Sequence, residues 1–176
     1  MDALTLARAM SIPVARAEKW LTPLTEAMAY ANIDTRLRKA AFLAQIGHES
    51  LSLMYTKEIG GDSYFAKYNG RADLGNTQPG DGPRFAGRGL IQVTGRANYL
   101  KCSLALFGDD RLLATPSLLE SPQWAAKSAA WFWKSKDLNA LADADRFTDL
   151  TRRINGGVNG LDDRKARYKT ALSVLK

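Results

Sequence analysis

Apolar residues recur at helical spacing through most of the chain. From residue 14 to residue 31 they fall three or four positions apart, which predicts an amphipathic helix entered at Ile12-Pro13. Its apolar positions are Val14, Ala17, Trp20, Leu21, Leu24, Ala27 and Met28. A second helix is predicted from Asp34, a residue type that caps helices, to about Ser50. Because it is apolar on nearly every side, we expect it to be the buried central helix, with Glu49 emerging at its C-terminal end.

The same periodicity predicts further helices in the second half of the chain. They run from about Gly95 to Phe107, from Ser121-Pro122 through Trp133, and onward from near Asp145 and near Asp162. Only the segment from Phe85 to Thr94 is predicted to be a short extended piece. No linker rich in Pro, Gly or Ser divides the 176 residues into comparable halves, so we predict a single, mainly α-helical domain over residues 1–176.

A glycine-rich stretch interrupts the helical pattern between Gly60 and Gly89. It holds eight of the fourteen glycines of the chain, together with Pro79 and Pro83. This density of turn-forming residues predicts a long loop. Loops of that length inside a compact domain are usually functional, and we expect this one to border or cover a cleft.

Basic residues outnumber acidic ones. The chain carries 25 Lys and Arg against 18 Asp and Glu, a net charge of +7, which favours an anionic target such as bacterial wall polymers, nucleic acid or an acidic membrane. From Arg146 onward, eight basic residues stand against three acidic ones. A solvated helix face explains this run as well as a ligand site does.

The N-terminal residues do not have the pattern of a secretion signal. Asp2 and Arg8 fall where such a signal has basic residues followed by an unbroken apolar run. No apolar stretch approaches the length of a membrane span. We therefore expect synthesis in the cytoplasm without membrane insertion, and passage provided by another protein if the target lies outside.

The single cysteine and the single histidine exclude two kinds of chemistry. Cys102 has no partner for a disulfide, and it is expected to be a small buried residue rather than a nucleophile. His48-Glu49 resembles the start of a zinc-protease helix, but no second His follows one turn later. His48 is therefore expected to be a hydrogen-bonding scaffold residue beside Glu49, and neither a metal nor an organic cofactor is expected.

Glu49 and Glu58 are candidates for a pair of catalytic carboxylates. Inverting glycosidases need a protonated acid and an ionised base roughly 6.5 to 9.5 Å apart. Glu49 ends a buried helix, where apolar neighbours favour the protonated carboxylic acid, whereas Glu58 lies in a polar stretch beside Lys57 and is expected to be ionised. From spacing alone, the alternative is favoured: a helix-end salt bridge for Glu49 and a solvated loop charge for Glu58.

Several ordered motifs between about Arg36 and the C-terminus resemble those of glycoside hydrolase family 19, most closely the short bacteriophage endolysins of that family. The motifs are Phe42-Leu43-Ala44-Gln45-Ile46-Gly47-His48-Glu49-Ser50, Tyr55-Thr56-Lys57-Glu58, Phe85-Ala86-Gly87-Arg88-Gly89-Leu90-Ile91-Gln92-Val93-Thr94-Gly95-Arg96-Ala97-Asn98-Tyr99 and Ile154-Asn155-Gly156-Gly157. The resemblance implies a lysozyme-like helical domain with a small β element beside the active-site cleft.

The resemblance also assigns roles to individual residues. It implies that Glu49 is the general acid, Glu58 the general base, and Thr94 the hydroxyl residue that helps to hold the attacking water. The polar side chains that line the sugar cleft fall on Gln92, Asn98 and Asn155. Arg164 is the candidate for an arginine in the charge network behind the acid. Without the resemblance, Thr94 and Asn155 would be taken as an ordinary strand residue and a turn residue.

The chain departs from the plant chitinases of the family in two ways. Those enzymes carry an aromatic residue where Ala97 stands, and they contain disulfides, which this chain cannot form. We therefore expect a more open cleft. The positive charge favours bacterial peptidoglycan and an anionic wall surface as partners, and we expect a monomeric endolysin. Two alternatives are enzymes: a chitinase, and a lytic transglycosylase, whose motifs resemble Glu49-Ser50 and Gly89-Leu90-Ile91-Gln92. The third is a basic module that only binds cell wall or nucleic acid, although nucleic acid is not expected.

Overall fold

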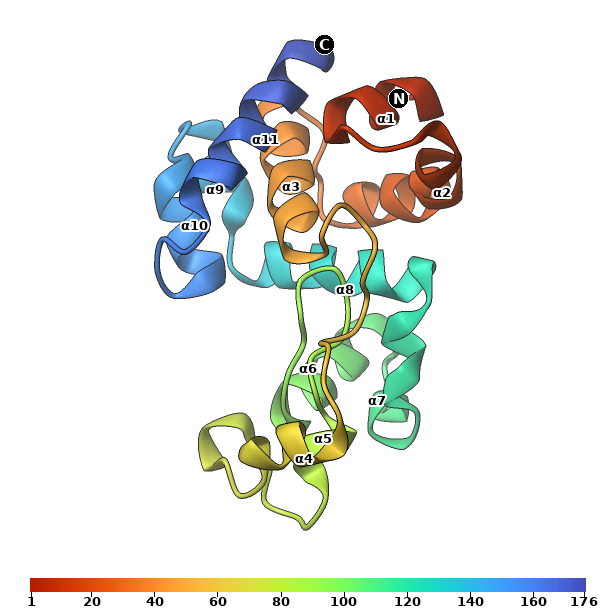
Figure 1. Ribbon diagram of the computed structural model, residues 1–176, viewed down its shortest axis with the longest axis vertical. Helices are drawn as coiled ribbons and strands as arrows, with labels where there is room; N and C mark the ends of the chain where they lie inside the picture. The colour runs from red at the N-terminus through yellow and green to blue at the C-terminus, as the bar shows by residue number, and fades with distance from the viewer.

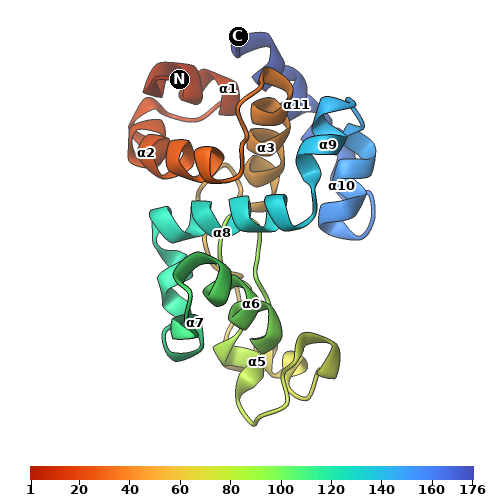
Figure 2. The ribbon, with the colours of Figure 1, turned by 180° about the vertical axis from the view of Figure 1, so that it is seen from behind.

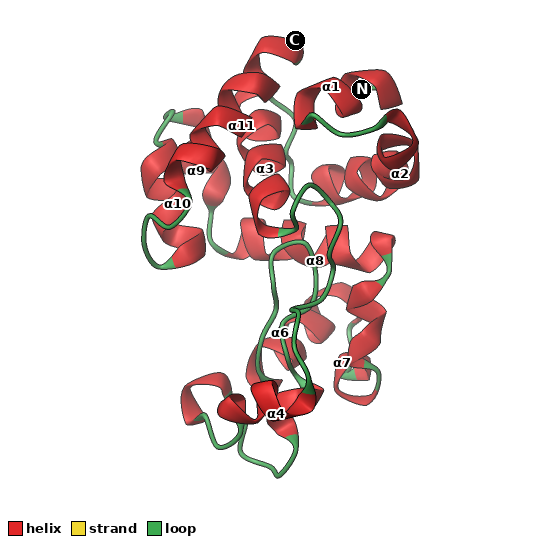
Figure 3. Ribbon diagram, viewed as in Figure 1, coloured by secondary structure: helices red, strands yellow, loops and turns green.

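The computed structural model describes all 176 residues, and nearly all of its regular structure is helical (Figure 3). The α-helices are α1 (Ala3–Met10), α2 (Val14–Tyr30), α3 (Arg36–Glu49), α4 (Asp62–Phe65), α5 (Asp81–Arg84), α6 (Arg96–Phe107), α7 (Arg111–Ala114), α8 (Pro122–Ser135), α9 (Leu138–Asp143), α10 (Phe147–Asn155) and α11 (Leu161–Val174). Three 3₁₀ turns accompany them: η1 (Ala66–Tyr68), η2 (Ala72–Leu74) and η3 (Pro116–Glu120). The mainly α fold class is confirmed.

Helix α3 is the central helix, as predicted. In Figures 1 and 2 it lies between α1 and α2 on one side and α9, α10 and α11 on the other, and it packs along α11. Every residue from Ala40 to Gly47 is buried. The predicted cap is wrong by one residue, because the Thr35 side chain accepts from the Arg38 amide while the Asp34 carboxylate accepts from the Arg38 guanidinium.

The apolar residues form two clusters that correspond to two lobes in Figure 1. The larger cluster holds 33 buried residues and lies among α1, α2, α3 and α8 to α11, which together make the large lobe. The smaller cluster holds six residues and lies beneath α6, α7 and η3 in the small lobe. Helix α8 crosses between the lobes, with Trp133 in the large cluster and Trp124 and Trp131 against the small one. The two lobes therefore share one rigid element.

The glycine-rich middle is more helical than predicted. Instead of a plain loop, residues 60–89 contain α4, η1, η2 and α5, each no longer than four residues. Left-handed glycines, such as Gly75 and Gly80 with φ of 69° and 81°, follow or precede these turns and end regular structure. Short helical turns satisfy their own backbone groups locally, which is why turn-rich sequence still forms them.

The predicted β element amounts to two isolated bridges. Lys57 pairs with Arg88, and Arg88 pairs with Val93, without a continuous strand. The Arg88 side chain is buried and donates to Glu120 Oε1 at 2.7 Å and to the Tyr99 hydroxyl at 3.0 Å. Leu90 and Ile91, between the bridges, belong to the large cluster. This segment therefore links the lobes.

Outside the glycine-rich stretch, three helices were not predicted from the sequence, namely α1, α7 and α9. Helix α1 is capped by Asp2, whose carboxylate accepts from the Thr5 amide at 2.7 Å, and the helix buries Leu6 and Met10. The other two span only four and six residues, too few for a periodic pattern. No helix in the chain combines the length and the apolar character needed to cross a bilayer.

Candidate active site

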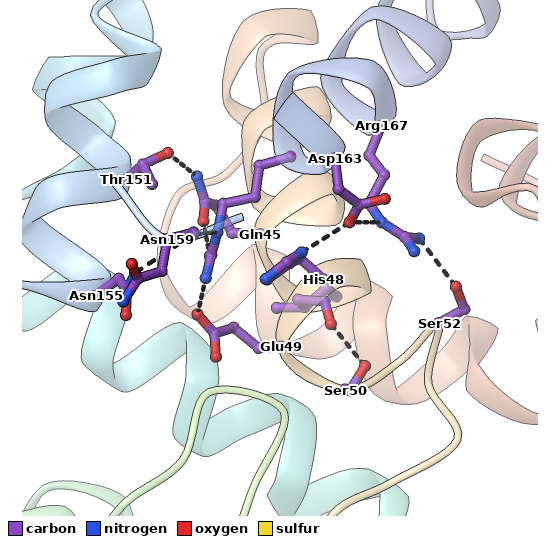
Figure 4. Close-up of polar contacts among 12 residues, drawn as sticks. Gln45, His48, Glu49, Ser50, Ser52, Thr151, Asn155, Asn159, Asp163 and Arg167 are labelled. Carbon is purple, nitrogen blue, oxygen red and sulfur yellow. Dashed lines mark hydrogen bonds and ion pairs between the residues drawn. The ribbon is translucent and has the colours of Figure 1, made fainter. Parts of the chain in front are cut away.

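Glu49, the last residue of α3, lies at the edge of a polar cluster formed by α3, α10 and α11 (Figure 4). Its Oε1 accepts from Arg164 Nη2 at 2.6 Å, and its side chain is 25% exposed. Oε2 has no hydrogen-bond partner within the protein. Because every fully buried side-chain polar atom is hydrogen-bonded, Oε2 is not fully buried. One oxygen is therefore anchored and the other is open to solvent. The expected apolar surroundings are wrong, because α11 brings a guanidinium against this carboxylate.

Arg164 is almost fully buried and connects three segments. Besides Glu49, it donates to the Gln45 side-chain oxygen and to the Asn159 carbonyl at 3.2 Å. Gln45 in turn donates to the Thr151 hydroxyl at 2.8 Å. A buried charge is stable only when its donors are satisfied, and here the acceptors come from α3 and from the loop before α11, while α10 contributes through Thr151 and Gln45. Sequence analysis missed Gln45 and Thr151, although a glutamine inside an apolar helix is a visible signal.

His48 belongs to a second, adjacent set of contacts. Its Nδ1 lies 2.7 Å from Asp163 Oδ2, which also accepts from Arg167 Nε at 2.7 Å. Partial burial by itself raises the pKa of Asp163, but the hydrogen bonds from Arg167 and His48 outweigh it and the pKa is lowered. The ionised carboxylate can only accept, so Nδ1 carries the hydrogen. Gly160 lies against the imidazole, where a Cβ would collide with the ring.

The chain leaves Glu49 through an unusual left-handed turn. Leu51, Ser52 and Leu53 have φ of 48°, 60° and 64°, a region that costs non-glycine residues roughly 1–2 kcal/mol each. The turn is held in place by Arg167, which donates to the Ser52 hydroxyl at 2.9 Å, and by Arg16, which donates to the Ser52 carbonyl at 3.1 Å. Nothing in the sequence indicates this turn.

Glu58 is surrounded by hydrogen-bond donors. The Tyr68 hydroxyl donates to Oε1 at 2.9 Å, the Gly87 amide donates to Oε2 at 3.3 Å, and Lys67 Nζ lies 4.0 Å from Oε1. Burial, followed by the hydrogen bond to Glu58, raises the pKa of Tyr68, so the phenol remains a donor. Lys57, the neighbour considered in the sequence, pairs with Glu120 instead. The side chain of Glu58 is 17% exposed, which is less than a solvated loop charge would be.

Three of the predicted site residues line one pocket of about 340 Å³. Gln92, Thr94 and Asn98 form its wall from the small lobe, and the Asn98 amide donates to the Thr94 carbonyl at 2.9 Å. The Gln92 side chain lies over Gly87, where a Cβ would come within 2.5 Å of its oxygen. The remaining lining residues, which the sequence did not indicate, are Val93, Lys101, Trp131, Phe132, Ser135 and Lys136.

Asn155 lies apart from this pocket. It ends α10, and its amide donates weakly to the Asn159 carbonyl at 3.4 Å, the same carbonyl that accepts from Arg164. Figure 4 shows Asn155 beside Asn159, on the Thr151 side of the polar cluster. The structure therefore groups Asn155 with the surroundings of Glu49, and Gln92 with those of Glu58.

Other reactive groups are poorly suited to chemistry. Cys102 is a free, fully buried thiol, and burial raises its pKa to about 12. A thiol with that pKa is not a nucleophile at neutral pH. No group of three or more His, Cys, Asp or Glu residues is arranged to hold a metal ion.

The sequence and the fold are similar to those of known proteins. No family model matches the chain. A protein of Haemophilus influenzae described as containing a glycosyl hydrolase family 19 domain is 31% identical, over 81% of this chain and 82% of its own length. The chain belongs to glycoside hydrolase family 19. The family predicted from the motifs is thus confirmed, and with it the assignment to glycoside hydrolases.

Further relatives within family 19 are named as chitinases. An endochitinase of Arabidopsis thaliana is 37% identical over 73% of this chain, which spans only 42% of that relative. Chitinase C from Streptomyces griseus superposes with a TM-score of 0.77 at 26% identity, covering 98% of this chain and 75% of the other. A bacterial family 19 chitinase superposes with a TM-score of 0.74 at 22% identity, which supports the fold alone. This family 19 protein thus has the chitinase fold, and the roles of its individual site residues stay predictions.

Proposed function

We propose that this family 19 protein hydrolyses β-1,4 glycosidic bonds of bacterial peptidoglycan by single displacement with inversion. The observation that carries the proposal is the contrast between its two carboxylates. Glu49 has one oxygen bound to Arg164 and one open to solvent, whereas both oxygens of Glu58 accept hydrogen bonds from Tyr68 and Gly87. An acid must release a proton from a free oxygen, and a base must stay ionised among donors, so the two environments suit different roles.

The proposed chemistry follows from these contacts. Glu49 donates a proton from Oε2 to the leaving glycosidic oxygen while Oε1 keeps its hydrogen bond from Arg164. Glu58 accepts a proton from water, and the water oxygen attacks the anomeric carbon on the opposite face of the sugar. Thr94, whose carbonyl is held by Asn98, presents its hydroxyl to that water. Arg164 stabilises the carboxylate that remains on Glu49 after proton transfer.

Peptidoglycan is proposed as the substrate because of charge. The net charge of +7 favours a polymer with carboxylates, whereas chitin is neutral. The Ala97 side chain packs closely against Gly75, because a Cβ added to Gly75 would lie only 2.6 Å from it. An aromatic side chain at position 97, as in the plant chitinases, would therefore require the η2 turn to shift. Chitin hydrolysis is the second candidate, favoured by the names of the relatives.

The endolysin role is part of the proposal. It rests on the resemblance of the motif order to short bacteriophage endolysins. In this role the protein acts as a monomer on the wall after another protein has made the membrane permeable.

Reducing-end analysis tests the proposed function. Purified sacculi and chitin oligosaccharides are digested with wild type, Glu49→Gln and Glu58→Gln, and the anomeric form of new ends is followed by NMR. We expect new reducing ends from sacculi with inverted configuration, and a loss of at least about 10²-fold in each variant. Anhydro-sugar ends with a fully active Glu58→Gln variant would instead indicate a lytic transglycosylase, and cleavage of chitin alone a chitinase. Salt-sensitive binding that survives Glu49→Gln, without sugar release by wild type, would indicate a binding module.

A further inference from the structure

The pocket beside Gln92 and Asn98 contains two lysines with no acidic partner. Lys101 projects from α6, and Lys136 follows the last residue of α8. Neither ammonium forms an ion pair within the protein, and no Asp or Glu is among the nine lining residues. Several basic residues elsewhere on the surface do form ion pairs, for example Arg71 with Asp73 and Arg111 with Asp109. The pocket is therefore a local centre of uncompensated positive charge.

The walls of this pocket suit a ligand that is partly sugar and partly anionic. Trp131 and Phe132 supply aromatic surface from α8, and Lys136 Nζ lies 5.9 Å from the Phe132 ring centroid. Amide and hydroxyl groups of Gln92 and Thr94 provide donors and acceptors for a sugar. Two ammonium groups that line the same hollow raise the local concentration of anions.

We propose that Lys101 and Lys136 form a subsite for the carboxylates carried by alternate sugars of a peptidoglycan strand, and that this subsite distinguishes peptidoglycan from chitin. The proposal rests on the proposed hydrolysis of peptidoglycan. Each muramic acid bears a lactyl ether that ends in a carboxyl group, which is either free or extended by a stem peptide with carboxylates of its own. Chitin has neither group. The same cleft that holds acetamido and hydroxyl groups would therefore gain affinity from these lysines only with the anionic polymer.

Binding to a catalytically inactive protein separates this subsite from the chemistry. In a Glu49→Gln background, calorimetry measures the Kd for three soluble tetrasaccharides: a peptidoglycan fragment with stem peptides, the same fragment with free lactyl carboxylates, and neutral chitotetraose. The test variant adds Lys101→Gln and Lys136→Gln. The matched control adds Lys39→Gln and Lys176→Gln, two lysines that line another hollow of about 310 Å³ with no predicted sugar-binding residue. Both double changes remove the same charge.

We expect Lys101→Gln/Lys136→Gln to raise the Kd of the anionic fragments roughly tenfold, and to leave chitotetraose within about twofold. The control should leave all three ligands within about twofold. The affinity difference between anionic and neutral ligands should shrink as salt is added. An effect confined to the fragment with free lactyl carboxylates assigns the lactyl group, and an effect confined to the fragment with peptides assigns the stem-peptide carboxylates. An effect on both fragments shows that the lysines bind either carboxylate. Lys101→Arg/Lys136→Arg should restore the preference, because it keeps both charges.

The proposal is overturned if the test variant weakens chitotetraose as much as the anionic fragments, or if it behaves like the control. Hydrolysis of sacculi by the wild-type protein is measured alongside. Absence of hydrolysis refutes the proposed function, while the binding series still decides the subsite. Thermal unfolding of each variant checks that the fold is intact, which is expected because both lysines are exposed.

Discussion

Replacing Arg164 by Met tests whether the buried guanidinium is what holds Glu49 in place. The side chain is only 2% exposed, and it binds Glu49, the Gln45 oxygen and the Asn159 carbonyl. Methionine is unbranched and flexible enough to fill much of the same space, so the change removes hydrogen bonds more than volume.

The expected loss of stability follows from two of these contacts. The hydrogen bond to the Glu49 carboxylate is charge-assisted and worth roughly 1.5–3 kcal/mol, and Gln45, which is fully buried, is left with an unpaired oxygen that costs about 1–3 kcal/mol. Because Glu49 is 25% exposed, its carboxylate regains some hydration in the variant. We therefore expect the free energy of unfolding to fall by about 3–4 kcal/mol, which is near the lower end of the losses found when a buried ion pair is broken. For a protein of this size that corresponds to a Tm lower by roughly 10 °C.

Urea unfolding monitored by circular dichroism measures this loss. Arg153→Met is the matched control, because Arg153 is an exposed arginine of α10 with no hydrogen bond or ion pair, and its free energy of unfolding should change by less than about 0.5 kcal/mol. Adding Gln45→Leu to Arg164→Met removes the unpaired oxygen and should recover about 1 kcal/mol or more. A loss below about 1 kcal/mol for Arg164→Met, or strict additivity in the double variant, would refute the reasoning.

Three further predictions follow from the surroundings of the site and the fold. Tyr68→Phe removes the hydroxyl that orients Glu58, so kcat/KM should fall about tenfold with little change in Tm. Leu51→Gly relieves a left-handed residue that is 57% exposed and should raise the free energy of unfolding by about 0.5–1 kcal/mol, as measured by urea unfolding. The pKa of Asp81 is lowered, mainly by its hydrogen bonds from Arg96, which outweigh the opposite effect of burial. The ionised carboxylate therefore stabilises the fold above about pH 4, and this contribution is lost as the pH falls through the lowered folded-state pKa. Asp81→Asn should therefore lose less stability than wild type between about pH 6 and pH 3 in unfolding titrations.

Each of these predictions has a control that differs in one respect. Tyr64→Phe removes a hydroxyl that has no hydrogen bond to Glu58, so an equal loss of kcat/KM there would argue against orientation of the base. Leu104→Gly affects a leucine of similar exposure, 52%, in the middle of α6, and should lower stability by about 1 kcal/mol; a loss in both variants would contradict the strain at Leu51. Asp110→Asn, on an exposed residue without an ion pair, should leave the pH dependence of stability as in wild type.

Local sequence patterns were sufficient for the long helices. The predicted helices at Val14, Gly95 and Ser121-Pro122 correspond to α2, α6 and α8 within one or two residues, because amphipathic spacing and terminal residues act within single segments. Family membership was also accessible, since the motifs around Glu49 and Glu58 are contiguous stretches. Short helices such as α7 and α9 were not, because four to six residues carry no period.

The environment of each candidate catalytic residue depended on the tertiary structure. Glu49 is paired with Arg164, 115 positions away, so the expected apolar surroundings were replaced by an ion pair that only the packing of α3 against α11 creates. Lys101 and Lys136 come together in one pocket for the same reason, since α6 and α8 pack against each other. Periodicity and motifs report which residues a segment contains and which of its faces is buried. Which charges meet across segments is determined by the free energy of packing the whole chain, and no single segment contains that information.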